Sequence, residues 1–207
     1  MGKGLTEGLR VARELGYTIH DHNFGNSSKA NLEGVLPTIV DVARLAIKLC
    51  PFDGTVIPNG GLRTQAAANQ NEANGTGIPD SRHLLQSDGF GHAIDCIALT
   101  PGAGIDWTNM AAFEAMAEAV KIASAILNVP IRQGCDWNMN GTFSEGNEWD
   151  WSHFEDPKQK YMAAAVAELA RYRRVLGLDE LDDQTDETAG PGCECPECGA
   201  PLRLLSL

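Results

Sequence analysis

Apolar residues recur at helical spacing in four segments of the chain, and each of these segments predicts a helix. The most regular segment spans residues 37–49, where apolar side chains fall three or four positions apart and a proline begins the first turn. The other three span residues 5–15, 107–127 and 157–176. Residues 65–80 are polar and predict a brief helix that leads into an irregular loop. Residues 23–28 predict a loop in which Ser27 or Ser28 could cap the segment that follows.

Four shorter segments predict β-strands. Residues 54–58 form a β-branched run, and residues 92–99 form an apolar run with Asp95 in its middle. Residues 131–137 and the segment around His153 are also predicted as short strands. An aspartate inside a buried strand is costly unless it is paired or binds a metal, so Asp95 is a candidate site residue. Together these elements predict an α+β fold, in which a small antiparallel sheet carries Asp95 and His153 and packs against helices.

The character of the chain changes after Leu178. We therefore predict one domain over residues 1–178, an acidic linker over 179–191 and a separate tail over 192–207. The tail is rich in cysteine, with Cys193, Cys195 and Cys198 close together. A closed structural zinc site needs four ligands and the tail offers three, so both a second metal site and an unstructured tail stay open.

Charge and hydropathy exclude several classes of partner. The formal net charge of −12 argues against nucleic-acid binding and against docking on an anionic membrane. No run of about 18 apolar residues predicts a transmembrane helix, and residues 1–10 do not resemble a secretory signal. We expect cytoplasmic synthesis, a monomer, and reduced thiols at the cysteines in the body of the chain, which are Cys50, Cys96 and Cys135.

Two stretches carry the candidate chemistry. Residues 81–95 (S-R-H-L-L-Q-S-D-G-F-G-H-A-I-D) supply His83 and Asp95, and residues 150–155 (D-W-S-H-F-E) supply His153 with Asp150 three positions before it. Two histidines and one carboxylate leave the fourth position of a tetrahedral zinc ion open for water, whose pKa falls toward neutral when it is bound. The fourth residue, Asp150, can then act as the general base. The pattern predicts a zinc hydrolase.

The other histidines favour structural interpretations. His92 lies in the same stretch as the candidate ligands, but its distance of three residues from Asp95 on a strand predicts that it faces the other way. His20 and His22 form an H-x-H pattern that fits a polar loop better than a metal site. None of these three is therefore expected to be a ligand.

Glu155 and the tryptophans near the motifs have two interpretations each. On a strand, Glu155 shares the face of His153, so we expect a supporting contact there and assign the base to Asp150. Three tryptophans could line a substrate groove or belong to the core, namely Trp137, Trp149 and Trp151.

The order of these motifs resembles a known family. S-x-H, then G-x-A-x-D, then D/E-x-x-H is similar to the zinc peptidases that include VanY-type D-Ala-D-Ala carboxypeptidases and the L-alanyl-D-glutamate peptidases of phage endolysins. Three further segments are similar to the family, namely residues 31–40 (N-L-E-G-V-L-P-T-I-V), 59–64 (N-G-G-L-R-T) and 131–137 (I-R-Q-G-C-D-W). The resemblance spans about residues 25–156.

The resemblance implies a role for each site residue. It implies that His83, Asp95 and His153 bind zinc, and that Asp150 deprotonates the bound water and passes the proton to the leaving amine. It also implies that Arg63 faces the substrate carbonyl or carboxylate, where its planar charge would stabilise the tetrahedral intermediate. For Ser81, the resemblance implies a substrate contact or support for a ligand.

The chain departs from the family pattern at three places. Five extra residues separate His83 from Gly91, and Gln133 and Cys135 replace a tryptophan and a glycine. An aspartate at Asp150, in place of a glutamate, resembles the endolysin branch.

The leading hypothesis is a zinc peptidase that hydrolyses the stem peptides of bacterial peptidoglycan, as an L-alanyl-D-glutamate endopeptidase. It would be made in the cytoplasm as an endolysin and would act on the wall after release. One alternative is a D-Ala-D-Ala carboxypeptidase of the same fold. Another is a non-catalytic zinc-binding module with a structural or interaction role.

Overall fold

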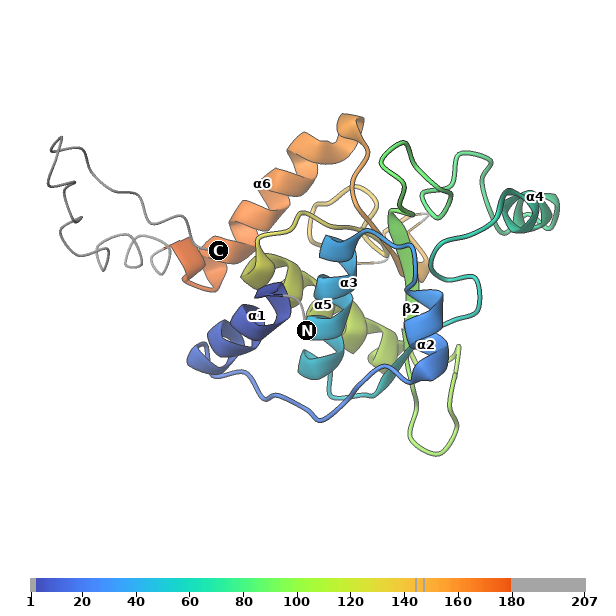
Figure 1. The fold of residues 1–207 in the computed structure, drawn as a ribbon. Helices are drawn as coiled ribbons and strands as arrows, with labels where there is room; N and C mark the ends of the chain where they lie inside the picture. Colours follow the sequence, from blue (N-terminus) through green and yellow to red (C-terminus); the bar gives the residue numbers. More distant parts are fainter. Residues whose placement is uncertain (1–2, 144, 147, 180–207) are drawn as a thin grey trace, which may run out of the picture.

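The computed structural model of the protein describes residues 3–143, 145–146 and 148–179. The predicted tail and nearly all of the predicted linker lie outside the described residues, and so do the three cysteines of the tail. Figure 1 shows the order of the described elements. They are α1 (Lys3–Glu14), α2 (Asn26–Asn31), α3 (Pro37–Leu49), β1 (Gly54–Val56), α4 (Gln65–Ala73), β2 (Ala93–Ala98), α5 (Met110–Leu127), β3 (Arg132–Gly134), β4 (Asp150–Glu155) and α6 (Gln159–Val175).

The four strands form one antiparallel sheet in the order β1-β2-β4-β3, which confirms the predicted sheet. The two central strands are β2 and β4, and every residue of β2 is buried. Across this central pair, Asp95 lies directly opposite His153 in the register. Two residues that are 58 positions apart in sequence are thus held side by side by backbone hydrogen bonds.

Helices α3 and α5 pack against each other and against the sheet, and α1 and α6 flank them (Figure 1). Apolar side chains fill the space between these layers, because each helix turns its apolar stripe toward the sheet. The residues with almost no exposure include Ile39 and Leu45 of α3, Val120 of α5 and Ile94 of β2. Because β2 packs against this core, the core holds Asp95 in a fixed position.

The predicted loop over residues 23–28 is wrong in its second half, because α2 begins at Asn26. Its N-cap residue is Gly25, so neither Ser27 nor Ser28 has that role. The Ser28 hydroxyl accepts a hydrogen bond from the Val56 backbone N–H at 3.1 Å, and it lies 3.0 Å from the Thr55 hydroxyl. Ser28 therefore joins α2 to the edge strand β1, a tertiary contact that local sequence signals do not show.

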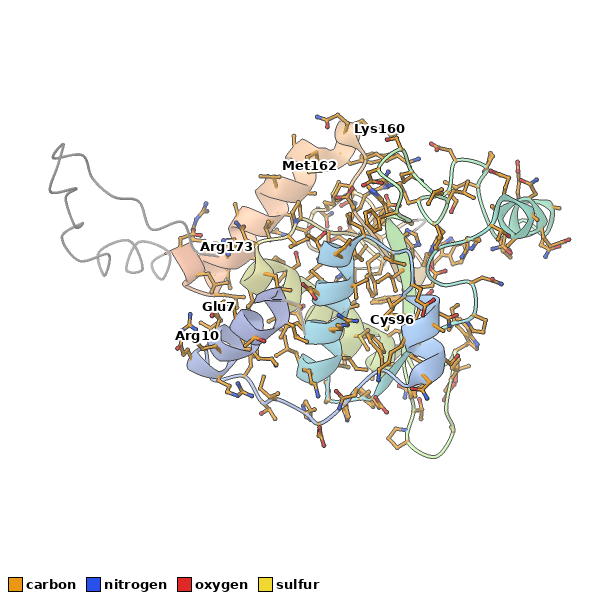
Figure 2. All side chains as sticks on the ribbon, viewed as in Figure 1. Glu7, Arg10, Cys96, Lys160, Met162 and Arg173 are labelled. Carbon is orange, nitrogen blue, oxygen red and sulfur yellow. The ribbon has the colours of Figure 1, made fainter. Side chains whose placement is uncertain are left out.

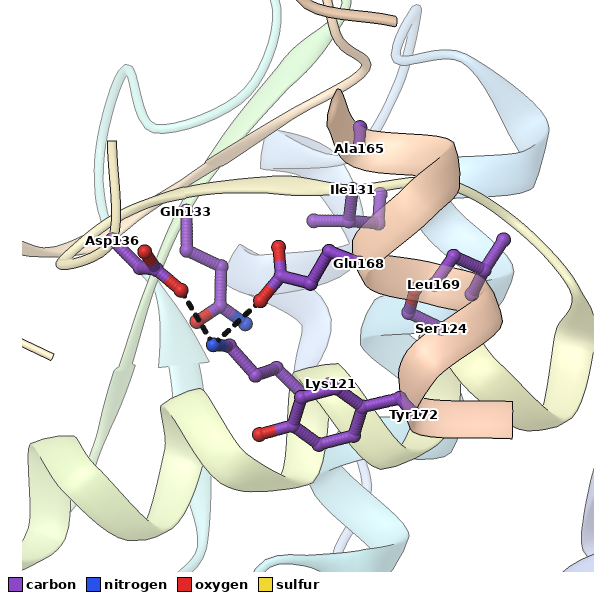
Figure 3. Close-up of a pocket in the computed structure, with 9 residues that line it drawn as sticks. All are labelled: Lys121, Ser124, Ile131, Gln133, Asp136, Ala165, Glu168, Leu169 and Tyr172. Carbon is purple, nitrogen blue, oxygen red and sulfur yellow. Dashed lines mark hydrogen bonds and ion pairs between the residues drawn. The ribbon is translucent and has the colours of Figure 1, made fainter. Parts of the chain in front are cut away.

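A buried ion cluster joins α5, α6 and the turn after β3; we call it the Lys121 cluster, made of Lys121, Asp136 and Glu168 (Figure 3). The Lys121 ammonium lies 2.7 Å from Asp136 Oδ2 and 2.8 Å from Glu168 Oε1. Asp136 also accepts the backbone N–H groups of Asn140 and Gly141, each at 3.0 Å. The cluster thereby anchors the start of the segment that leads from β3 to β4.

The cysteines of the body, Cys50, Cys96 and Cys135, are free and buried, as expected of reduced thiols. Cys96 lies on β2 among core side chains (Figure 2). Within the described residues, no helix combines the length and the apolar character needed to cross a bilayer.

Candidate metal centre

The three predicted ligands come from three separate places in the fold. Asp95 and His153 project from the central strands β2 and β4, and His83 lies in the loop before β2. That loop is fastened to the preceding segment, because the Arg63 backbone N–H donates to the His83 carbonyl at 2.8 Å. All three side chains are largely shielded from solvent, with a residue exposure of 9% or less.

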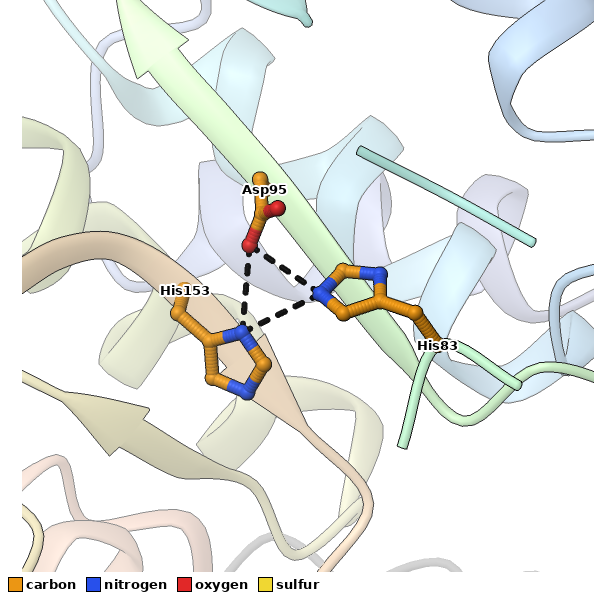
Figure 4. Close-up of side chains that lie close together, drawn as sticks. All are labelled: His83, Asp95 and His153. Carbon is orange, nitrogen blue, oxygen red and sulfur yellow. Dashed lines mark hydrogen bonds and ion pairs between the residues drawn. The ribbon is translucent and has the colours of Figure 1, made fainter. Parts of the chain in front are cut away.

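One donor atom of each residue converges on a single point (Figure 4). His83 Nε2 lies 3.2 Å from Asp95 Oδ1 and 3.3 Å from His153 Nδ1, and His153 Nδ1 lies 3.1 Å from Asp95 Oδ1. Ligands of a tetrahedral zinc ion, at bond lengths of about 2.0–2.2 Å, are separated by about 3.3–3.5 Å. The spacing of the three donors therefore fits a zinc ion with only small adjustments.

In each histidine, one ring nitrogen faces the donor group and the other, outer nitrogen faces away. The hydrogen bond of the outer nitrogen shows whether the inner nitrogen is free to bind a metal. His83 Nδ1 lies 2.9 Å from the Gly61 carbonyl oxygen, which can only accept, so this nitrogen carries the proton. His153 Nε2 lies 3.2 Å from Glu155 Oε2. Burial alone would raise the pKa of Glu155, but contacts with His153 and Arg132 hold it below its usual value, and the carboxylate accepts a hydrogen bond.

Three lone pairs therefore face one another, from the two inner nitrogens and the Asp95 carboxylate. Such a group needs a cation at its centre, either a proton or a metal ion. Without a metal, burial disfavours the charged imidazolium, yet hydrogen bonds to Asp95 and Glu155 outweigh burial and raise the pKa of His153 to about 10. Burial would raise the pKa of Asp95, but His83 and His153 hold it far below its usual range. A bound metal would displace the proton.

Two more predicted site residues support the ligands directly. Arg63 Nη2 lies 3.0 Å from Asp95 Oδ2, the oxygen that points away from the histidines, and Arg63 Nε donates to the Asn59 carbonyl at 3.0 Å. The Ser81 hydroxyl accepts the His83 backbone N–H at 3.3 Å. The predicted substrate contacts of Arg63 and Ser81 stay predictions.

Asp150 stands at the first position of β4 and is half-buried. The Ser152 hydroxyl donates to its Oδ1 at 3.3 Å. Burial raises the pKa of Asp150, and the negative charge of Asp95 adds to this effect, while the nearby His153 opposes it. A carboxylate with a raised pKa, within the electrostatic reach of the donor group, has the properties of a general base.

A register shift in the pairing of β3 with β4 positions Asp150 near the donor group. Gln133 is paired with Phe154, but the next residue, Gly134, is paired with Asp150, so the register shifts between them. Such irregularities re-aim side chains near active sites. A Cβ atom on Gly134 would lie 2.4 Å from the Asp150 carbonyl oxygen, so only glycine permits this close approach.

The remaining histidines stay outside the donor group. His92 interacts with Asp88 Oδ2 at 2.8 Å and with Asp156 Oδ2 at 3.0 Å, in agreement with its predicted structural role. His20 and His22 stack on each other, with ring centroids 5.3 Å apart. Within the part of the chain that the structure describes, His83, Asp95 and His153 form the one group with metal-ligand geometry.

The three tryptophans differ in their surroundings. The ring of Trp137 lies 5.3 Å from that of His153, and the ring of Trp151 lies 5.5 Å from that of Phe143. Trp149 is 72% exposed. Only Trp137 therefore packs directly against a candidate ligand.

A shallow groove opens beside His83. Its walls are two short segments next to the donor group, and they comprise Leu62, Arg63, Thr64, Gln65, Leu84 and Leu85. Leu85 is 64% exposed and lies in the stretch that is longer than the family pattern. The extra residues after His83 thus form one wall of a groove at the edge of the site.

Sequence reasoning missed two contributors to the site. The Gly61 carbonyl fixes the proton on His83, and Arg132 pairs with Glu155 at 3.2 Å. The first is a backbone group, which carries no side-chain signal. The second is a pair of opposite charges on neighbouring strands, which is visible only once the register of the strands is known.

Comparisons with known proteins found relatives that match most of the chain. A family model described as phage L-alanyl-D-glutamate peptidase matches residues 21–157, a range that contains all the site residues. The chain is 35% identical over 139 residues to the L-alanyl-D-glutamate peptidase of Escherichia phage T5, covering 64% of this chain and 96% of that protein. It also matches the crystal structure of the L-Ala D-Glu endopeptidase ChiX of Serratia marcescens, with a TM-score of 0.52 and 26% identity, over 68% of this chain and 95% of the other. The chain belongs to the family of phage L-alanyl-D-glutamate peptidases.

Proposed function

We propose that this protein is a zinc-dependent endopeptidase that hydrolyses the L-alanyl–D-glutamate bond in the stem peptides of bacterial peptidoglycan. The observation that carries the proposal is the convergence of His83 Nε2, Asp95 Oδ1 and His153 Nδ1 at 3.1–3.3 Å. Family membership supports the choice of bond, since the relatives in phage T5 and Serratia marcescens are named for it.

The donor set favours zinc. Two imidazole nitrogens and one carboxylate oxygen are typical ligands of catalytic zinc, and three protein ligands leave one position for water or substrate. A bound zinc ion would supply a Lewis acid that lowers the pKa of water and polarises the peptide carbonyl. A purely structural zinc site is usually closed by four protein ligands, so the set of three favours an enzyme over a non-catalytic module.

Asp150 is the group to which we assign the proton transfer. Ser152 engages its Oδ1, so we assign to Oδ2 the proton of the attacking water. The same carboxyl group then delivers that proton to the leaving amine nitrogen of the D-glutamate residue. The raised pKa of Asp150 favours both steps, because a base whose pKa lies closer to neutral both accepts and returns a proton readily.

Arg63 has two tasks in this proposal. It holds Asp95 through Nη2, which fixes the orientation of the carboxylate whose other oxygen is a donor to the metal. It also lines the groove beside His83, where its planar guanidinium suits the carbonyl or a carboxylate of the substrate. Ser81 supports His83 through the backbone, because its hydroxyl accepts the His83 backbone N–H.

We propose that the protein acts on the cell wall after release from the cell in which it is made. Neither a nucleic acid nor a membrane is a proposed partner, and we propose that the protein works as a monomer. The second candidate function, a D-Ala-D-Ala carboxypeptidase, would use the same residues on a different bond of the same stem peptide.

Digestion of purified peptidoglycan by the zinc-loaded protein tests the proposal. Mass spectrometry of the products identifies the newly formed termini. A new amino terminus at D-glutamate is the expected result, and free D-alanine would instead indicate the carboxypeptidase. Absence of cleavage in wall preparations of differing chemistry would contradict an enzymatic role and favour the non-catalytic module.

A further inference from the structure

Arg132 of β3 contacts two aromatic rings, a backbone carbonyl and a carboxylate. Its guanidinium carbon lies 3.8 Å from the ring centroid of Tyr161 and 4.3 Å from that of Trp137. Its Nε donates to the Trp137 carbonyl at 3.1 Å, and its Nη1 lies 3.2 Å from Glu155 Oε1. Stacking and hydrogen bonding together leave the guanidinium one well-defined orientation.

The contacts of Arg132 continue to the candidate metal ligand. Glu155 uses Oε1 for Arg132 and Oε2 for His153 Nε2, at 3.2 Å each. Arg132 and Glu155 are direct partners in the register of β3 and β4, so the strand pairing itself places the two charges together. Trp137 adds a parallel link, because it packs against Arg132 and against the His153 ring.

We infer that Arg132 is a positioning residue of the metal centre, which acts through Glu155 to fix His153 as an Nδ1 donor. This inference rests on the proposed metal site. A neutral imidazole carries one proton, and the hydrogen bond made by one ring nitrogen decides which nitrogen faces the metal. Arg132 holds the Glu155 carboxylate in the orientation that accepts the proton of Nε2, and Nδ1 is thereby left to bind.

The other histidine of the site has a different anchor. His83 is oriented by the Gly61 carbonyl, a backbone group that no side-chain substitution removes. The orientation of His153 instead depends on a chain of two side chains. The metal affinity should therefore be sensitive to residues 132 and 155, although neither lies in the donor group.

Zinc affinity of the full chain, measured by competition with a chromophoric chelator, tests the inference without reference to cell-wall cleavage. We expect Arg132→Gln to weaken zinc binding by roughly 10- to 100-fold, the range seen when partners of ligand histidines are removed. Arg132→Lys should recover part of the affinity, since lysine can pair with Glu155 but cannot stack as a plane between two rings. A matched control is Arg173→Gln on α6 (Figure 2), which removes another buried arginine, one that donates to the Ala125 carbonyl at 2.7 Å.

A double-variant cycle separates positioning from general loss of packing. If Arg132 acts through Glu155, then Arg132→Gln should weaken zinc binding little further in a Glu155→Gln background. If Arg132→Lys is the only arginine variant that folds, the same cycle is run with that substitution. His83→Ala measured in parallel reports any zinc held elsewhere in the chain, so that this fraction can be subtracted.

Two results would overturn the inference and leave the proposed metal site intact. One is an unchanged zinc affinity of the folded Arg132→Gln variant. The other is an additive effect of the arginine substitution and Glu155→Gln in the cycle, whichever arginine variant is used. A wild-type chain that binds zinc no better than His83→Ala would refute the proposed metal site itself, and the inference with it.

Discussion

The molecule contains two buried polar clusters that differ in one respect. In the Lys121 cluster, an ammonium group lies within 2.8 Å of both carboxylates, so the chain supplies its own cation. In the group of His83, Asp95 and His153, the ring protons point outward to Gly61 and Glu155, and three acceptors face one another. The first cluster is complete as folded and anchors a loop. The second has no lysine or arginine side chain between its donor atoms, and this difference supports the proposed metal site.

Among the substitutions that test this comparison, removal of a metal ligand should have the largest effect on zinc content and on cleavage rate. We expect His83→Ala and His153→Ala to lose the zinc of the site and to lose cell-wall cleavage by on the order of a thousandfold or more, since the Lewis acid contributes several kcal/mol to the barrier. Zinc content and cleavage rate are the measurements. His20→Ala is the matched control, because His20 stacks on His22 outside the donor group. Unchanged zinc content in both ligand variants would refute the ligand set.

Removal of the base should separate metal binding from turnover. We expect Asp150→Asn to retain the zinc of the site but to lose about 10²- to 10⁴-fold in cleavage rate, as is typical when general base catalysis is lost. The exposed Glu33 offers a control, since Glu33→Gln removes an acid outside the site and should leave both quantities unchanged. Full activity of Asp150→Asn would show that another group takes the proton.

Substitution in the Lys121 cluster should lower the stability of the protein. Of the substitutions considered, it should change zinc affinity the least. We expect Lys121→Met to lower the free energy of unfolding by about 3–5 kcal/mol, because it leaves two buried carboxylates without their cation. Denaturant unfolding measures this loss, with Lys29→Met on the surface of α2 as the control. At denaturant concentrations below the unfolding transition, the zinc affinity of Lys121→Met should stay close to that of the wild type. A large loss of zinc in the folded variant would mean that the two clusters are coupled.

The sequence was most informative where a local pattern decides the structure. The helix predicted over residues 37–49 matches α3, because apolar periodicity and an initial proline are both local signals. Asp95 in an apolar run and His153 in D-x-x-H are predicted as two ligands of one zinc ion, and the strand register places them opposite each other.

The remaining features depend on contacts between distant segments. Helix α2 is stabilised by Ser28 against β1, and Asp150 approaches the site through a register shift opposite Gly134. The pairing of Arg132 with Glu155 likewise follows from the strand register. None of these has a signature in a short window of sequence, because each arises only when the sheet has formed.

An anomalous difference map at the zinc edge, from crystals of the full chain grown with zinc, tests the central claim most directly. We predict a peak at about 2.0–2.2 Å from His83 Nε2, Asp95 Oδ1 and His153 Nδ1, with both outer ring nitrogens still bonded to Gly61 and Glu155. Zinc bound only at other positions, with the three side chains hydrogen-bonded to one another, would contradict it.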